Sequence, residues 1–251
     1  MSAKKQKIIF FMIKLLLSNF KRTLFCCIEF MLRWPVKEMK AILFLAGKFQ
    51  LTQKIRKEIK VAGLVVAADS GALHAKKAGV SPHYIVGDFD SLGKGDRSLW
   101  GLSPEKFISF PSKKDKSDGH LALEFVLSKK PKEIVFLGAL GGKLDYLFSN
   151  LFLLTKIPAS IPAKIVDAGS EIYWVRKKQV LHGKKGDRVS MLPIAPSGAV
   201  LKTKGLLYAL HRKKLHFGSH GLSNQMTKDR CEIHVLQGGV FVFHDCGQTG
   251  V

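Results

Sequence analysis

The sequence predicts an α/β protein in which a parallel-sheet, three-layer α/β domain is followed by a small all-β sandwich or barrel domain. Two observations lead to this fold class. Residues 39–157 alternate continuous apolar runs with stretches of helical spacing, which is typical of a parallel sheet covered on both faces. Residues 158–251 instead contain short β-rich runs separated by Gly, Pro and Ser, without a stretch of helical spacing.

Each segment of the first domain follows from its own pattern. Short apolar runs predict strands, and segments whose apolar residues recur every three or four positions predict helices. The expected strands lie within residues 41–47, 64–71, 83–90, 106–112 and 133–142. The expected helices lie within residues 52–60, 72–79, 120–130 and 144–156. Strands that alternate with helices in this way pair in parallel.

The second domain is expected to follow a linker with the sequence IPASIPA, at residues 157–163. Its short runs are rich in β-branched and aromatic residues and end at turn-forming residues, which indicates strands. These strands lie within residues 163–175, 179–183, 187–195, 199–210 and 231–243.

Residues 1–38 form a basic, apolar segment that stands apart from this pattern. Their longest uncharged runs, 8–13 and 15–20, are much shorter than the ~20 apolar residues of a membrane span. No convincing small-residue cleavage site follows, as a signal peptide would need. We therefore expect an extension, or a misassigned start, ahead of Met39. The alternative is contact of residues 1–38 with a membrane surface.

The composition limits the partners and the compartment. The formal charge of +22 invites a nucleic-acid interpretation. The basic residues are spread along the chain, however, and no RNA-binding or helix-turn-helix pattern occurs, so nucleic acid is not favoured as the partner. The four cysteines have neither zinc-ligand spacing nor a disulfide pattern, which favours a reducing cytoplasm.

Carboxylates follow the strands of the first domain, at the edge where ligands of such sheets bind. In the stretch VGDFDSL, Asp88 and Asp90 would share one face of a strand and repel each other unless a cation lay between them. A solvated turn is the alternative. The shared location of six acids favours a metal, and the six are Asp69, Asp88, Asp90, Asp115, Asp118 and Asp145.

Four longer motifs carry a family resemblance. In chain order they are AADSGALHAKKAGVSPHYIVGDFDSL, SKKDKSDGHLAL, LGALGGKLDYLFSNL and KGLLYAL…LHFGSHGLSN. Together they resemble thiamine pyrophosphokinase (thiamine diphosphokinase) of the bacterial type, over roughly Met39 to Phe243. The resemblance implies an enzyme that transfers pyrophosphate from ATP to thiamine and yields thiamine diphosphate and AMP. It also implies Mg²⁺ dependence and a homodimer whose active site lies between the α/β domain of one subunit and the β domain of the other.

The resemblance also assigns roles to residues in the first domain. Hard Mg²⁺ prefers oxygen ligands, so we expect Asp69, Asp88, Asp90 and Asp118 at the metal, the last three being catalytic. We expect ATP to contact Lys114, Asp115, Gly141, Gly142, Lys143 and Asp145. Glycines let backbone N–H groups approach phosphate ahead of a helix, although Gly141–Gly142 taken alone could be a structural turn.

In the β domain the resemblance places thiamine against Tyr208, with Ser223 and Asn224 as polar partners. Taken alone, Tyr208 fits a half-buried packing residue better than a ligand platform. The chain departs from the family pattern at Lys143, where Arg is usual, and at Tyr146, where His is usual. Lysine keeps the positive charge but lacks the bidentate fork of arginine, so the contacts to ATP differ there.

Two other functions compete with this interpretation. A glycosyltransferase that uses a metal and a nucleotide-sugar would explain the Asp-Phe-Asp element, but it gives no role to KDKSD, GGKLD or the β domain. A non-enzymatic basic protein that binds nucleic acid or an anionic membrane would rest on the charge and on residues 1–38. Preference for ATP over UDP-sugars, and salt-sensitive DNA or lipid binding, separate these alternatives.

Overall fold

The computed structural model describes residues 39–89, 101–110, 115–218 and 221–246. The chain divides into two compact units, Met1–Glu38 and Met39–Val251, and all of the described residues belong to the second. Two predicted site residues, Asp90 and Lys114, lie outside the described residues, as does the N-terminal extension.

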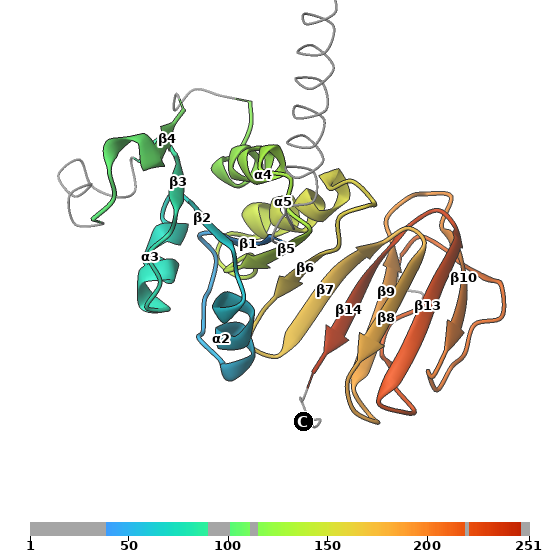
Figure 1. Ribbon diagram of the computed structural model, residues 1–251. Coiled ribbons are helices and arrows are strands. Elements are labelled where there is room, and N and C mark those ends of the chain that lie inside the picture. Colours follow the sequence, from blue (N-terminus) through green and yellow to red (C-terminus); the bar gives the residue numbers. More distant parts are fainter. Residues whose placement is uncertain (1–38, 90–100, 111–114, 219–220, 247–251) are drawn as a thin grey trace, which may run out of the picture. The chain divides into compact units, whose positions relative to one another are not determined.

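The first half of the Met39–Val251 unit alternates strands and helices, as the sequence predicts (Figure 1). Its strands are β1 (Lys40–Phe44), β2 (Leu64–Ala68), β3 (Tyr84–Gly87), β4 (Phe107–Ser109) and β5 (Glu133–Leu137). Its α-helices are α2 (Gln53–Lys60), α3 (Gly71–Lys77), α4 (Asp118–Ser128) and α5 (Leu144–Leu153). Two 3₁₀ turns, η3 (Pro104–Lys106) and η4 (Leu154–Lys156), complete it.

The strands of this half pair in parallel in the order β5-β1-β2-β3-β4. Alternate residues of each strand face opposite sides of the sheet. On one side, Leu43 and Phe136 pack with α4 and α5, and on the other side, Ile42 and Val135 pack with α2 and α3. The expected three-layer arrangement follows from these two apolar faces.

The second half is all strand apart from turns and loops, within the described residues. Its strands are β6 (Ala163–Val166), β7 (Ser170–Val175), β8 (Lys178–His182), β9 (Arg188–Pro193), β10 (Ala199–Lys204), β11 (Lys213–Leu215), β12 (Asn224–Gln225), β13 (Arg230–Gln237) and β14 (Val240–Asp245). A four-stranded sheet in the order β11-β10-β13-β8 packs on β9, β14 and β7 around a separate apolar core.

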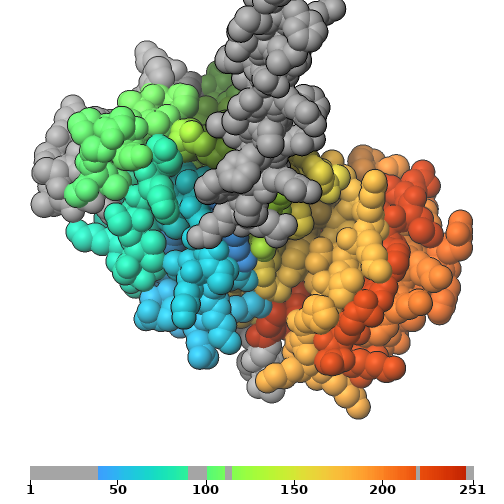
Figure 2. Space-filling model, viewed as in Figure 1, coloured from blue at the N-terminus to red at the C-terminus, as the bar shows by residue number. Residues whose placement is uncertain are grey.

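Backbone pairing continues through the expected boundary between residues 157 and 158. Strand β6 pairs in parallel with β5, and β7 then turns back antiparallel to β6. One ten-stranded sheet therefore runs from β4 to β12, and in Figure 2 the yellow-to-red surface continues directly from the blue-to-green surface. Without β6, β5 would be an edge strand with unpaired backbone groups, and pairing with β6 satisfies them. The division into domains stays a prediction.

A network of buried charges joins α2 to the strands of the second half. Lys164 on β6 pairs with Glu58 on α2 at 2.7 Å and with Glu171 on β7 at 2.9 Å. Lys40 on β1 also pairs with Glu58.

Among the described residues, no helix has both the length and the apolar character that a membrane span requires.

Candidate active site

A pocket of about 490 Å³ lies where β1, β2 and β3 end, at the edge predicted from the sequence. Loops after the strands and the first turns of α4 and α5 line it. It gathers three of the predicted metal ligands with the predicted phosphate loop. The lining residues are Leu45, Ala46, Gly47, Ala68, Asp69, Ser70, Asp88, Ser117, Asp118, Gly119, Gly141, Gly142, Lys143, Tyr146 and Asn150.

Asp69 follows β2 directly, and its backbone fixes it beside the end of β3. The residue has a φ of +43°, which is rare for a residue other than glycine. Its N–H donates to the carbonyl of Val86 at 2.8 Å. Gly87 allows this approach, because a Cβ there would lie only 3.1 Å from the Cβ of Asp69. The strained backbone therefore holds a largely buried carboxylate at the pocket wall.

Asp88 lies one residue beyond the end of β3 and not within a regular strand. Asp90 lies outside the described residues, so a face shared by Asp88 and Asp90 stays a prediction. Phe89 between them has a φ of +64° and is buried. Its ring packs edge-on against Phe107 at 5.7 Å between centroids. Phe89 therefore anchors the turn from which Asp88 enters the pocket.

Asp118 is the first residue of α4, and the helix start explains its position. Ser117 precedes it in extended conformation, and the Ser117 hydroxyl accepts a hydrogen bond from the N–H of His120 at 3.3 Å. Serine is a favoured N-cap because it satisfies a free backbone donor. The positive end of the helix dipole and the oxygens of Ser117 and Asp118 therefore face the same pocket.

The turn at Gly141–Gly142 lines the same pocket as these acids. Both glycines have positive φ, +75° and +72°, and a Cβ on Gly141 would clash with the side chain of Lys48. Lys143 then caps α5 without a side-chain bond to the helix backbone. Its ammonium lies 5.7 Å from the centre of the Tyr146 ring, in cation–π contact. Backbone donors and one positive charge thus converge on the pocket.

Sequence reasoning missed several pocket residues. Gly47 accepts a hydrogen bond from His74 at 2.7 Å, and a side chain at Gly47 would meet the carbonyls of Gly138 and Leu140. The buried Asn150 donates to the carbonyl of Ala139 at 2.9 Å and so fixes the loop ahead of the glycine turn. The glycine that ends the run AILFLAG is the sequence signal that could have identified Gly47. No local pattern identifies Asn150.

Two predicted site residues do not line the pocket. Asp115 and Asp145 are described and exposed. Asp145 lies in the first turn of α5, where a carboxylate stabilises the positive end of the helix dipole. Their proposed contacts to ATP stay predictions.

The predicted thiamine residues lie together in the second half. A hollow of about 570 Å³ is lined by Tyr208, Leu210, Leu222 and Asn224, among others. Tyr208 is 68% exposed, so it is not a half-buried packing residue. Asn224 is buried, and its amide both accepts from the N–H of Tyr208 at 3.0 Å and donates to the carbonyl of Tyr208 at 2.9 Å. Asn224 therefore fixes the loop that presents the ring.

Ser223, the third predicted thiamine residue, does not line this hollow. It has a φ of +56°, and its N–H donates to the hydroxyl of Ser190 at 3.0 Å. Its side chain is exposed, and the residue directly precedes Asn224 in the sequence. A contact to thiamine stays a prediction for this residue.

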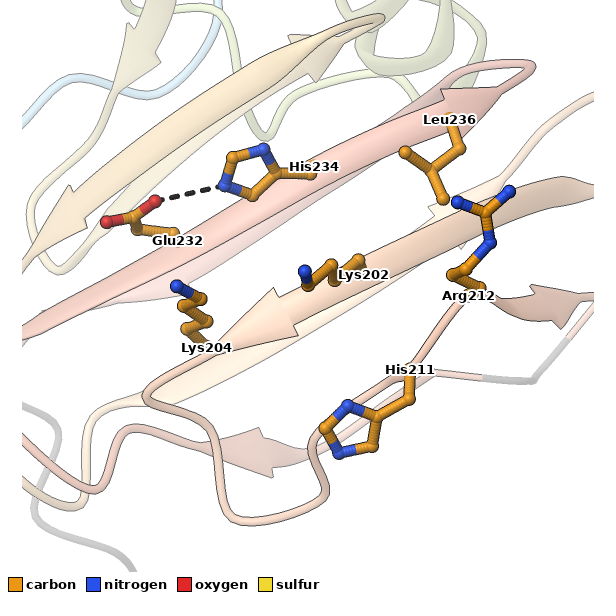
Figure 3. A pocket seen from close by; sticks show the side chains of 7 residues that line it. All are labelled: Lys202, Lys204, His211, Arg212, Glu232, His234 and Leu236. Carbon is orange, nitrogen blue, oxygen red and sulfur yellow. Dashed lines mark hydrogen bonds and ion pairs between the residues drawn. The ribbon is translucent and has the colours of Figure 1, made fainter.

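A third hollow, of about 500 Å³, lies on the outer face of the four-stranded sheet and contains no predicted site residue (Figure 3). Its walls are mostly basic. Glu232 pairs there with His234 at 3.0 Å, and hydrogen bonds from His234 and Lys178 lower the pKa of Glu232 to about 2. The lining residues are Lys202, Lys204, His211, Arg212, Glu232, His234 and Leu236.

Models of protein-family domains match most of the sequence. The model described as "Thiamin pyrophosphokinase, catalytic domain" matches residues 55–166, which include the whole pocket wall except its β1 end. The model described as "Thiamin pyrophosphokinase, vitamin B1 binding domain" matches residues 175–239. The sequence is also 26% identical over 179 residues to the thiamine pyrophosphokinase of Bacillus subtilis (strain 168), covering 70% of this chain and 84% of that protein.

Solved structures share the fold. The crystal structure of the Bacillus subtilis thiamine pyrophosphokinase aligns with a TM-score of 0.73 at 23% identity, covering 82% of this chain and 99% of that one. The enzyme from Geobacillus thermodenitrificans gives 0.71 at 24% identity, covering 85% and 100%. That from Candida albicans gives 0.68 at 16% identity, covering 84% and 91%. With two domain models of one family matched in order over more than half of its length, the chain belongs to the thiamine pyrophosphokinase family.

Proposed function

We propose that the chain is an ATP-dependent thiamine diphosphokinase. The hydroxyethyl oxygen of thiamine attacks the β-phosphorus of ATP and loses its proton. The bond from that phosphorus to the oxygen bridging the α- and β-phosphates breaks. AMP leaves with the bridging oxygen, and thiamine carries away the β- and γ-phosphates. The pocket that gathers three carboxylates with a double-glycine turn is the observation that carries this proposal.

The donor set at the acidic wall fits Mg²⁺. Asp69, Asp88 and Asp118 offer carboxylate oxygens, and Ser70 and Ser117 line the same pocket. Hard oxygen donors without sulfur or imidazole are the ligands that Mg²⁺ prefers. We infer that the three aspartates hold the ion, with Asp90 as a further candidate ligand. The ion would neutralise charge on the polyphosphate.

The glycine turn and the start of α5 fit the phosphates of ATP. The N–H groups at Gly141 and Gly142, the free N-terminal donors of α5 and the ammonium of Lys143 are all complementary to anionic oxygens. With so little covalent chemistry for side chains to perform, holding donor and acceptor in line supplies most of the rate. Lys143 neutralises charge as a point cation rather than as a bidentate fork.

The acceptor has a different requirement, which the Tyr208 hollow meets. Thiamine carries a cationic thiazolium ring and a flat pyrimidine, and an exposed aromatic face stabilises both by stacking and cation–π attraction. We propose that Tyr208 provides this face, with Asn224 as the positioning residue that fixes its loop and Ser223 as a polar neighbour. The two hydrogen bonds from Asn224 to the backbone of Tyr208 support this assignment.

Exposed apolar side chains support a homodimer with active sites shared between subunits. Four lie on α5 and four lie on the loops around Tyr208. Groups of exposed apolar side chains that form a contiguous patch mark interaction surfaces, and we propose such a surface here. The eight are Leu144, Tyr146, Phe148 and Phe152 on α5, and Leu207, Tyr208, Phe217 and Leu222 on the loops. Pairing two copies would cover both patches and would bring a thiamine surface to each phosphate pocket.

Incubation of the full chain with ATP, Mg²⁺ and thiamine tests the proposal by its nucleotide product. We expect AMP in equal amount to thiamine diphosphate. ADP with thiamine monophosphate would identify a single-phosphoryl kinase instead. Hydrolysis of UDP-sugars in place of ATP would favour the glycosyltransferase alternative.

A further inference from the structure

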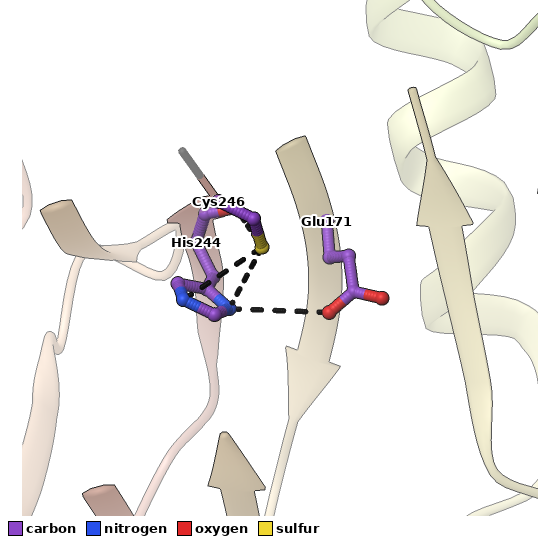
Figure 4. Close-up of side chains that lie close together, drawn as sticks. All are labelled: Glu171, His244 and Cys246. Carbon is purple, nitrogen blue, oxygen red and sulfur yellow. Dashed lines mark hydrogen bonds and ion pairs between the residues drawn. The ribbon is translucent and has the colours of Figure 1, made fainter. Parts of the chain in front are cut away.

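Three side chains of the types that bind metal ions lie close together at a site that shares no residue with the pocket or the Tyr208 hollow (Figure 4). Glu171 on β7 lies opposite His244 on β14 in the strand register, and Cys246 follows two residues later. Their ligand atoms all lie within 4.8 Å of one another. Glu171 and His244 are buried, and Cys246 is partly exposed.

We propose that Glu171, His244 and Cys246 bind a thiophilic divalent cation of the Zn²⁺ class, with solvent at the fourth position. Zn²⁺ bonds of ~2.0–2.3 Å in a tetrahedron place neighbouring donors ~3.3–3.8 Å apart. The Sγ of Cys246 lies 3.3 Å from the Nδ1 of His244, and that Nδ1 lies 3.9 Å from the Oε2 of Glu171. The donors therefore need only small shifts to close around an ion.

The surroundings fix the histidine in the orientation that metal binding needs. Its second nitrogen, Nε2, lies 3.3 Å from the Oδ2 of Asp187, and that oxygen accepts the N–H of Lys184 at 2.8 Å. A carboxylate on the far nitrogen sets the ring and the tautomer of a metal-bound histidine. A Cβ on Gly183 would clash with both atoms of this contact, so the glycine makes room for it.

In the metal-free chain, two of the ligand atoms already contact lysine ammonium groups. An entering metal ion must compete with these contacts. Lys54 on α2 lies 3.1 Å from the Oε1 of Glu171 and 3.2 Å from the Sγ of Cys246. Lys164 also takes Oε1, whereas Oε2 accepts from the Tyr173 hydroxyl and faces His244. Since the side chain of Lys54 is 33% exposed, its ammonium can move into solvent when an ion enters.

The contacts of His244 also change its affinity for protons. Burial lowers the pKa of His244, but hydrogen bonds with Cys246 and Glu171 raise it to about 10. Metal ions compete with protons for histidine nitrogens. The competing account is a purely structural one, in which an imidazolium bridges Glu171 and Asp187 and no metal binds.

Cobalt is the probe that separates these accounts. Co²⁺ is added to the full chain with a non-thiol reductant and saturating Mg²⁺, and the near-ultraviolet thiolate-to-cobalt absorption is recorded. Oxygen ligands do not produce this band, so ions at the aspartates stay silent. We expect one equivalent to bind with the band present, and Zn²⁺ to abolish it. Absence of the band in the native chain overturns the proposal.

Two cysteine variants show which cysteine gives rise to the absorption band. Cys246→Ser should abolish it, whereas Cys231→Ser, which removes the other described free cysteine, should retain it. Cys26 and Cys27 are present in both variants, so any absorption that they contribute is the same in both. A band of equal intensity in Cys246→Ser and Cys231→Ser overturns the proposal. Because that variant could fail to fold, Lys54→Met provides a second test. Removal of a competing positive charge should tighten Co²⁺ binding about 3- to 10-fold, and unchanged or weaker binding contradicts the proposal.

Discussion

The pocket at the strand ends, which we propose binds phosphate, and the Tyr208 hollow are built in different ways. The pocket lies at the edge of a parallel sheet, and its acids and glycines are fixed by backbone geometry, with positive φ at Asp69, Gly141 and Gly142. The hollow is formed by strand and loop residues together, and its central ring is 68% exposed and held through one buried amide, that of Asn224.

This difference indicates that the pocket and the Tyr208 hollow have different roles in the proposed reaction. One copy of the chain contains a walled pocket suited to a metal ion and a polyphosphate. It presents the proposed thiamine surface without a cover, and a stacking site gains most when its ligand is desolvated. The contrast therefore predicts that changes in the pocket abolish turnover, whereas changes in the hollow alter the affinity for thiamine.

Asp88→Asn should have the largest effect. Loss of an ionised ligand removes several kcal/mol of charge stabilisation, so kcat should fall by about 100-fold or more. The fold should persist, since the residue lies on a loop beyond β3. Asp229→Asn, at an exposed aspartate outside the pocket, is the matched control and should turn over normally. Normal kcat in Asp88→Asn at saturating ATP and Mg²⁺ would remove Asp88 from the metal site.

Asn224→Ala should weaken the hollow and the fold together. The change leaves the N–H and the carbonyl of Tyr208 without their partner, which costs about 1–3 kcal/mol of unfolding free energy. Urea unfolding measures the loss, and steady-state kinetics should show a raised thiamine KM with the ATP KM little changed. An unaltered thiamine KM in a destabilised variant would mean that the loop does not position the ring.

Tyr208→Ala should act on thiamine alone. Loss of a stacking and cation–π contact worth about 0.5–2 kcal/mol should raise the thiamine KM roughly 3- to 30-fold. Tyr208→Phe keeps the ring and should be nearly neutral. An unchanged thiamine KM in the alanine variant would exclude stacking by Tyr208.

Mixed dimers test whether the two sites meet across subunits. Chains carrying Asp88→Asn and chains carrying Tyr208→Ala each lack one part of the site. When they are mixed at limiting thiamine, heterodimers should regain activity, because one shared site then has both native parts. No gain on mixing, with heterodimers verified by tagged pull-down, would place both parts of each site on one subunit.

Substitution of Glu58 tests the ion pairs that connect α2 to the strands of both halves. Burial raises the pKa of Glu58, but hydrogen bonds with Lys164 and Lys40 outweigh it and lower the pKa below 4.5. A lowered folded-state pKa contributes stability that is present above pH 4.5 and lost as the pH falls below it. Glu58→Gln should therefore unfold at lower urea than the native chain at pH 7, by an amount that shrinks on acidification below pH 4.5. A difference independent of pH would contradict this role of the charge.

The smallest effect is expected from removing residues 1–38. Met39–Val251 is a compact unit, and every residue assigned to either site lies within it. A chain that starts at Met39 should keep its thermal midpoint and its kcat. Loss of solubility or activity on truncation would show that the extension belongs to the fold.

Periodicity predicted the first half well, because each strand and helix of a covered parallel sheet buries a characteristic apolar pattern. The edge location of Asp69, Asp88 and Asp118 followed from the same pattern. What the sequence does not show is non-local: β6 extends the first sheet through backbone pairing with β5, which no side-chain pattern encodes. The turn at Phe89 and the clamp by Asn224 likewise depend on contacts between segments far apart in the sequence. Tyr208 was located by family resemblance rather than by its local pattern.

The most direct test of the central claim follows one phosphorus atom. The full chain is incubated with Mg²⁺, thiamine and ATP radiolabelled at the β-phosphorus, and the products are separated. Transfer of pyrophosphate predicts that the label moves entirely into thiamine diphosphate, with unlabelled AMP released. Label that stays with the nucleotide as ADP, while thiamine is phosphorylated, would contradict the proposed reaction.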